Sequence, residues 1–225
     1  VDGKGVVRLR SLVANAVAGA NCPAPRTYFA HYYKRYLQFM DEPAITNNDI
    51  VMLGNSLTEG GGDWGKRLGK DNIINRGISG DVAMGIYDRL HQILPGKPKQ
   101  IFLLIGVNDI SHDLSTDSIV NMIEKNVTRI QRESPETKLY LQSLLPIDES
   151  FNRYKKLTNK TYQIPEINDR LKALAKEKKI DFIDLYPLFT EKGTNVLRKE
   201  LTYDGLHLKE EGYKIWVDAI KKKMK

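Results

Sequence analysis

Four short segments of this sequence carry side chains that could together perform nucleophilic catalysis. Ser56 follows a short apolar run, and Asp204 and His207 lie three residues apart near the other end of the chain. A serine hydroxyl is a weak nucleophile at neutral pH and needs a base, and an imidazole can accept its proton near neutrality. Asp204 could accept the other imidazole N–H, which would fix the tautomer and stabilise the imidazolium. We therefore expect Ser56, His207 and Asp204 to act as nucleophile, base and orienting acid.

Two further segments supply donors for the oxyanion that forms when a hydroxyl attacks an ester carbonyl. These segments contain Gly80 and Asn108. The expected donors are the backbone N–H groups of Ser56 and Gly80 and the side-chain amide of Asn108. Each residue taken alone also has a structural explanation, such as a turn or a local hydrogen bond. Their joint occurrence favours catalysis.

The pattern between these segments alternates strands and helices. Short apolar runs predict strands, and amphipathic segments predict helices after them, which is typical of a parallel sheet covered by helices on both faces. The run Ile101–Ile105 is apolar throughout, which favours a central strand buried on both sides. The predicted strands are 50–54, 72–75, 100–105, 138–143 and 180–184, and the predicted helices are 64–69, 81–93, 116–133, 162–178 and 209–223.

The four segments resemble the sequence blocks of the SGNH (GDSL-type) hydrolase and esterase family. The matching segments are Gly54-Asn-Ser-Leu, Gly77-Ile-Ser-Gly80-Asp, Gly106-Val-Asn-Asp and Asp204-Gly-Leu-His207. The resemblance extends from about residue 49 to 223 and implies a flavodoxin-like three-layer α/β/α sandwich with the roles given above. It also implies hydrolysis of acyl esters or thioesters without a metal or cofactor. The family often has Asp where this chain has Asn55, for which we expect a changed local hydrogen-bond network rather than lost activity.

The sequence says less about the substrate than about the reaction. We expect short acyl esters, in particular acetyl esters on carbohydrates, because no long apolar stretch near the blocks would line an acyl-chain channel. A lysophospholipase or thioesterase acting on lipid acyl chains is the alternative. The long connection 144–165 is either a substrate-facing flap or a passive surface loop. The residues expected to contact substrate are Trp64, Phe151 and Tyr154.

Composition excludes several other classes of function. The chain has 225 residues, 41% hydrophobic and 28% charged, as in an ordinary globular protein. Its net charge of +7 is dispersed, and the lysine run at the C-terminus suits a solvated helix end better than a nucleic-acid surface. One cysteine, Cys22, excludes an internal disulfide, and the four histidines lack metal-ligand spacing. We expect no metal, no nucleic-acid partner and no transmembrane segment, whereas the oligomeric state stays open.

The N-terminal region is not part of the functional argument. Residues 1–25 form a poorly specified arm, and 26–225 are expected to form one domain that begins with an amphipathic helix over 26–40. Arginines precede the alanine-rich stretch 11–20, which loosely resembles a secretory signal and favours a periplasmic or secreted location.

Three competing interpretations fit less well. Gly60, Gly62 and Gly65 satisfy a dinucleotide fingerprint, but they do not follow the strand directly. A phosphate-binding loop would need a hydroxyl where Arg67 stands. An α/β-hydrolase elbow would need glycine at Thr58. A binding module that keeps the fold without turnover remains the non-enzymatic alternative.

Overall fold

A sheet of five parallel strands runs through the centre of the protein. The computed structural model describes residues 27–224. The strands are β1 (Ile50–Gly54), β2 (Ile73–Gly77), β3 (Gln100–Leu104), β4 (Lys138–Gln142) and β5 (Asp181–Ile183). Their spatial order is β2-β1-β3-β4-β5, and every neighbouring pair is parallel. The predicted five-stranded parallel sheet is confirmed, with strand ends that differ by up to two residues from the predicted ones.

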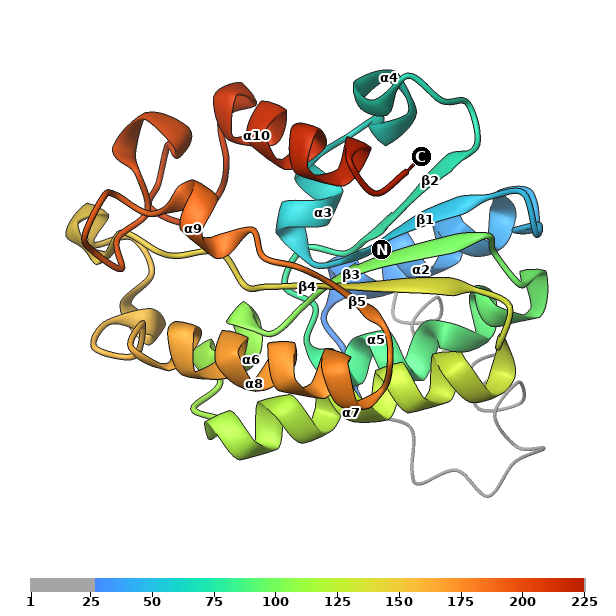
Figure 1. The fold of residues 1–225 in the computed structure, drawn as a ribbon, viewed down its shortest axis with the longest axis horizontal. Helices are drawn as coiled ribbons and strands as arrows, with labels where there is room; N and C mark the ends of the chain where they lie inside the picture. The colour runs from blue at the N-terminus through green and yellow to red at the C-terminus, as the bar shows by residue number, and fades with distance from the viewer. Residues whose placement is uncertain (1–26, 225) are drawn as a thin grey trace.

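Helices cover both faces of the sheet (Figure 1). The side chains of a strand alternate between these two helical layers. In β1, Val51 and Leu53 join one apolar cluster, and Ile50 and Met52 join the other. The first cluster packs against α5 (Ala83–Arg89), α7 (Thr116–Glu133) and α8 (Gln163–Glu177). The second packs against α3 (Ser56–Gly60), α4 (Trp64–Leu68), α9 (Tyr186–Phe189) and α10 (Glu210–Lys221). The result is the expected α/β/α sandwich.

The first described helix, α2 (Ala30–Asp41), lies outside these two clusters. It buries Tyr32, Tyr36 and Phe39 against Ile78, which directly follows β2. The Tyr32 hydroxyl donates to the carbonyl of Gly85 in α5 at 3.0 Å. This helix therefore packs beside the loop that carries Gly80.

Some elements differ from the predicted ones for local reasons. The predicted helix 81–93 ends at Arg89 and continues as two 3₁₀ turns, η1 (Leu90–Gln92) and η2 (Leu94–Gly96). Pro95 lacks an N–H for helical hydrogen bonding, and Gly96 costs backbone entropy in a helix. Three short helices, α3, α6 (Val107–Ser111) and α9, were not predicted, because four or five residues make little more than one helical turn and give only a weak periodic pattern.

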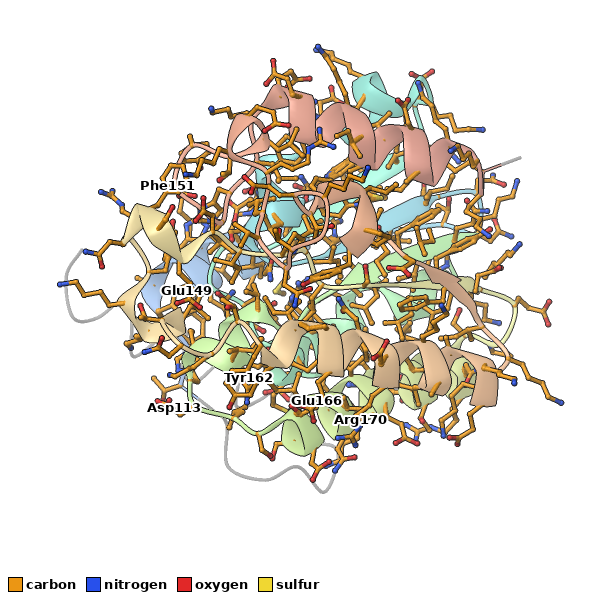
Figure 2. All side chains as sticks on the ribbon, turned by 60° about the vertical axis from the view of Figure 1, so that its left-hand side comes forward. Asp113, Glu149, Phe151, Tyr162, Glu166 and Arg170 are labelled. Atoms are coloured by element: carbon orange, nitrogen blue, oxygen red, sulfur yellow. The ribbon has the colours of Figure 1, made fainter. Side chains whose placement is uncertain are left out.

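The connection between β4 and α8 contains only short turns. These are η3 (Glu149–Phe151) and η4 (Lys155–Leu157), and a further turn η5 (Lys199–Leu201) precedes α10. In Figure 2, Glu149, Phe151 and Tyr162 mark the course of this connection. Among residues 27–224, no helix combines the length and apolarity needed to cross a membrane. The predicted N-terminal arm lies outside the described residues, and the single-domain assignment of 26–225 stays a prediction.

Candidate active site

The predicted catalytic and oxyanion residues all lie at one edge of the sheet. Ser56 begins α3 directly after β1, Gly80 follows β2, and Asn108 lies in α6 after β3. Asp204 and His207 occupy the loop before α10. Because parallel strands point the same way, the loops after their carboxyl ends share one edge of the sheet, where ligands bind in open α/β folds.

A continuous chain of hydrogen bonds joins the serine to the carboxylate. His207 Nε2 lies 2.9 Å from Ser56 Oγ, and His207 Nδ1 lies 2.8 Å from Asp204 Oδ2. With the proton on Nδ1, the imidazole donates to the carboxylate and Nε2 is free to accept the serine proton. Residues separated by about 150 positions in sequence are thus in direct contact.

The turn that carries Asp204 and His207 is held by its own polar groups. Asp204 Oδ1 accepts hydrogen bonds from the backbone N–H groups of Leu206 at 3.0 Å and His207 at 2.7 Å. Thr202 Oγ1 donates to the His207 carbonyl at 2.7 Å. Gly205 has φ +88°, and a Cβ there would lie 2.3 Å from the Asp148 carbonyl oxygen. A glycine is therefore needed to bring the imidazole into position.

Hydrogen bonds keep the Asp204 carboxylate ionised. Burial alone would raise its pKa, but the donors Tyr154 and His207, with the backbone N–H groups, lower the pKa below its usual value. Tyr154 donates to Asp204 Oδ2 at 2.6 Å, and its hydroxyl lies 2.9 Å from His207 Nδ1. Burial and the neighbouring carboxylate raise the pKa of Tyr154, so the phenol stays a donor.

The three candidate oxyanion donors border the same cavity as the serine. Ser56 is the first residue of α3, a position whose N–H has no partner within the helix. Gly80 has φ +83°, and a Cβ there would lie 2.8 Å from Phe29 Cζ. Asn108 uses one amide N–H to bond the Asp81 carbonyl at 2.8 Å, which orients the side chain and leaves the second N–H available.

Two buried acids, Asp81 and Asp109, are next in sequence to the proposed oxyanion donors Gly80 and Asn108. Arg89 Nε donates to Asp81 Oδ2 at 2.9 Å, and both side chains are fully buried. Burial raises the pKa of Asp81 to about 6 despite this partner. Asp109 accepts from the Ala83 N–H with both oxygens at 3.1 Å, and burial raises its pKa to about 7. These groups hold the backbone next to Asn108 and Gly80.

A cavity of about 990 Å³ opens above the serine. Its lining includes the predicted residues Ser56, Gly80, Asn108, Tyr154 and His207. Among residues 27–224, no cluster of three or more His, Cys, Asp or Glu side chains could hold a metal ion.

Two of the residues expected to contact substrate lie elsewhere. Trp64 is 1% exposed, donates its indole N–H to the Thr58 carbonyl at 2.9 Å and packs edge-on against Trp216 in the core. This prediction is wrong because α10 covers the indole. Phe151, which Figure 2 labels, is partly exposed and packs beside Gly205. It does not line the cavity.

Tyr203 and Glu59 are among the cavity residues that were not predicted from the sequence. Tyr203 is 61% exposed and stacks on the His207 imidazole with ring centroids 6.0 Å apart. Its position next to Asp204 in the sequence could have indicated that Tyr203 lies at the site. Glu59 also borders the cavity and contacts His31 of α2. No local sequence pattern indicates this contact.

Asn55, the departure from the family pattern, caps helix α3. Its Oδ1 accepts from the Leu57 N–H at 3.0 Å, which an aspartate oxygen would also do. Its buried Nδ2 has no hydrogen-bond partner among the described residues, so the local network does differ from one built on a carboxylate.

A serine, an imidazole and a carboxylate lie in contact at the carboxyl ends of the parallel strands, and such groups can hydrolyse esters through a serine nucleophile. Residues 52–215 match the GDSL-like lipase/acylhydrolase family, which is more than half of the chain. The chain belongs to this family.

Several proteins are similar to this chain at sequence identities of 25% or less. The N-acylneuraminate cytidylyltransferase of Escherichia coli O18:K1:H7 (strain RS218 / NMEC) is 25% identical over 77% of this chain. The matched part spans only 39% of that relative's length. The GDSL-like lipase of Bacteroides thetaiotaomicron is 25% identical, with a TM-score of 0.76 over 87% of this chain and 98% of the other. An acetyl xylan esterase shares the fold at 22% identity, with a TM-score of 0.65 over 79% and 100% of the two chains.

Proposed function

We propose that the protein is a serine esterase in which Ser56, His207 and Asp204 form the catalytic triad. The observation that carries the proposal is the unbroken contact from Ser56 Oγ through the imidazole to Asp204, at 2.9 and 2.8 Å. Ser56 Oγ attacks the ester carbonyl while His207 takes its proton. The imidazolium then protonates the departing alcohol, which leaves an acyl group on the serine. A water molecule, activated by the same imidazole, releases the acid and restores the serine.

The oxyanion of each tetrahedral intermediate would bind three N–H groups. These are the backbone N–H groups of Ser56 and Gly80 and the amide of Asn108, all of which border the cavity. Donors that are fixed before reaction stabilise developing charge without reorganisation. The hydrogen bond from Asn108 to the Asp81 carbonyl supports this role because it fixes the amide plane.

The substrates we propose are short acyl esters, most specifically acetyl esters of carbohydrates. The cavity lining combines hydroxyl, amide and charged side chains with three leucines, Leu157, Leu206 and Leu208. The exposed ring of Tyr203 offers a flat surface for a sugar beside His207. The acetyl xylan esterase is a solved protein with this fold and such a substrate in its name.

Acyl-chain profiling tests this proposal. We expect the highest kcat/KM for acetyl among p-nitrophenyl esters from acetyl to palmitoyl, together with release of acetate from acetylated xylo-oligosaccharides. A preference for palmitoyl esters or for lysophospholipids would replace the substrate proposal with lipid acyl hydrolysis. Binding of these esters without turnover would instead mean that the protein is a binding module.

A further inference from the structure

The segment Arg153–Lys156 is held beside the proposed catalytic pair. Tyr154 is fixed by its hydrogen bonds to Asp204 and His207. Consecutive Cα atoms are about 3.8 Å apart, so the backbones of Arg153 and Lys155 are placed with Tyr154. At the C-terminal end of the segment, Leu157 is buried in the apolar core and anchors the short turn η4. The basic side chains therefore extend from a fixed backbone.

Three cations of this segment line the cavity without a carboxylate partner. Arg153, Lys155 and Lys156 are exposed, and none lies within ion-pair distance of an acidic side chain of residues 27–224. The nearby Lys160, by contrast, pairs with Asp113. Three neighbouring cations repel one another, and an anion between them would relieve this repulsion.

The acidic residue on the cavity wall is already compensated. Glu59 accepts hydrogen bonds from the Ser79 N–H at 2.5 Å and from the Ser79 hydroxyl at 2.7 Å. His31 Nε2 lies 3.0 Å from both Glu59 oxygens, and Arg35 Nε lies 3.5 Å from one of them. The uncompensated charge of the cavity lining is therefore positive.

The position of this charge indicates which part of the substrate it would contact. In the proposed mechanism, His207 donates a proton to the oxygen of the departing alcohol, so the alcohol must leave on the side of the imidazole. Tyr154 contacts that imidazole, and the cations flank Tyr154. Gly80 and Asn108, the proposed oxyanion donors, come from other loops.

We propose that the site selects esters whose alcohol part carries an anionic group, which Arg153, Lys155 and Lys156 bind. This inference rests on the proposed esterase function and deepens it. A guanidinium matches the geometry of a carboxylate or phosphate with two parallel hydrogen bonds, and the two ammonium groups add charge and donors. A cleft with one sign of charge also raises the association rate of oppositely charged substrates in a salt-dependent way.

Three matched acetyl esters test this inference. The substrates are mono-acetylated methyl glycosides of glucose, glucuronic acid and glucose phosphate, which differ only in having a neutral, carboxylate or phosphate group. Acetate release gives kcat/KM for each. We expect at least one acidic ester to exceed the neutral ester by about tenfold at low salt, and this ratio to shrink as ionic strength rises. The larger of the two ratios identifies the preferred anion.

Lysine substitutions test whether this segment causes the preference for acidic esters. The double substitution Lys155→Gln with Lys156→Gln should lower the acidic-to-neutral ratio of kcat/KM about tenfold, which corresponds to about 1.4 kcal/mol. Lys172→Gln with Lys176→Gln is the matched control, because both lysines are exposed on α8, away from the cavity lining, and should leave the ratio unchanged.

The outcomes separate this inference from the function on which it rests. Equal kcat/KM for the neutral and acidic esters, unchanged by the double substitution, would overturn the inference and leave the esterase function intact. If neither these esters nor p-nitrophenyl acetate were hydrolysed, the proposed function would be wrong, and the inference with it.

Discussion

The phenol of Tyr154 donates a 2.6 Å hydrogen bond to Asp204 Oδ2, the oxygen that also contacts the imidazole of His207. This contact ties the long connection between β4 and α8 to the proposed triad. Tyr154 was predicted from the sequence to contact substrate, and its side chain lines the cavity. Its hydrogen bonds indicate a second role, which is to hold the orientation and charge of the carboxylate that orients the base.

Tyr154→Phe keeps the ring and removes the donor. A hydrogen bond to a charged group contributes about 1.5–3 kcal/mol, so we expect kcat to fall roughly tenfold or more. Because Asp204 loses a donor that lowers its pKa, the carboxylate becomes more basic and the acid limb of the kcat–pH profile should move to higher pH. Tyr162→Phe is the control, since this tyrosine lies on the same connection and is 67% exposed. A wild-type rate and profile for Tyr154→Phe would contradict the positioning role.

Asp204→Asn tests the orienting acid. The amide oxygen can still accept from the Leu206 and His207 N–H groups, so the turn should persist. The amide cannot stabilise an imidazolium as a carboxylate does, and in triads this change costs on the order of 10⁴ in kcat. Steady-state kinetics with p-nitrophenyl acetate measures the effect, and circular dichroism checks the fold. A loss below tenfold would remove Asp204 from the mechanism.

Asn108→Ala tests the oxyanion donor. Loss of one such donor lowers kcat about 10²–10³-fold, and KM should change little because the interaction strengthens only in the transition state. Asn121→Ala on the exposed side of α7 provides the control and should behave as wild type. An increase in KM with unchanged kcat would mean that Asn108 binds the ground state instead.

The parallel sheet could be predicted from the sequence because short apolar runs alternate with amphipathic segments along the chain. Ser56 and Asn108 directly follow the buried strands β1 and β3, and the parallel order brings them to one edge. Sequence patterns hold no information on distant packing partners, so the burial of Trp64 against Trp216 was missed. The same limit applies to Glu59, whose partner His31 lies 28 residues away on α2.

Buried Asp109 should make stability depend on pH. Burial raises the pKa of Asp109 from the ordinary 3.8 to about 7, so the folded protein favours the protonated carboxyl group. The contribution of Asp109 to the free energy of unfolding is therefore fully present below pH 4 and is lost as pH rises through about 7. Between pH 5 and 8, the free energy of unfolding should fall by roughly 2–3 kcal/mol through this group alone.

Asp109→Asn isolates this contribution. An amide oxygen can still accept from the Ala83 N–H and does not ionise. Urea unfolding at pH 5 and pH 8 should therefore show a smaller loss of stability in the variant than in the wild type. Equal losses in the two proteins would show that Asp109 does not titrate in this range.

The nucleophile itself can be identified by covalent capture. A fluorophosphonate reacts with a serine only when a base activates its hydroxyl. Mass spectrometry of the treated protein should find one adduct, on the peptide that contains Ser56. The adduct should be absent in Ser56→Ala, and hydrolysis of p-nitrophenyl acetate by that variant should fall by about 10⁶. An adduct on another residue, or more than a few per cent of wild-type activity in Ser56→Ala, would contradict the proposed mechanism.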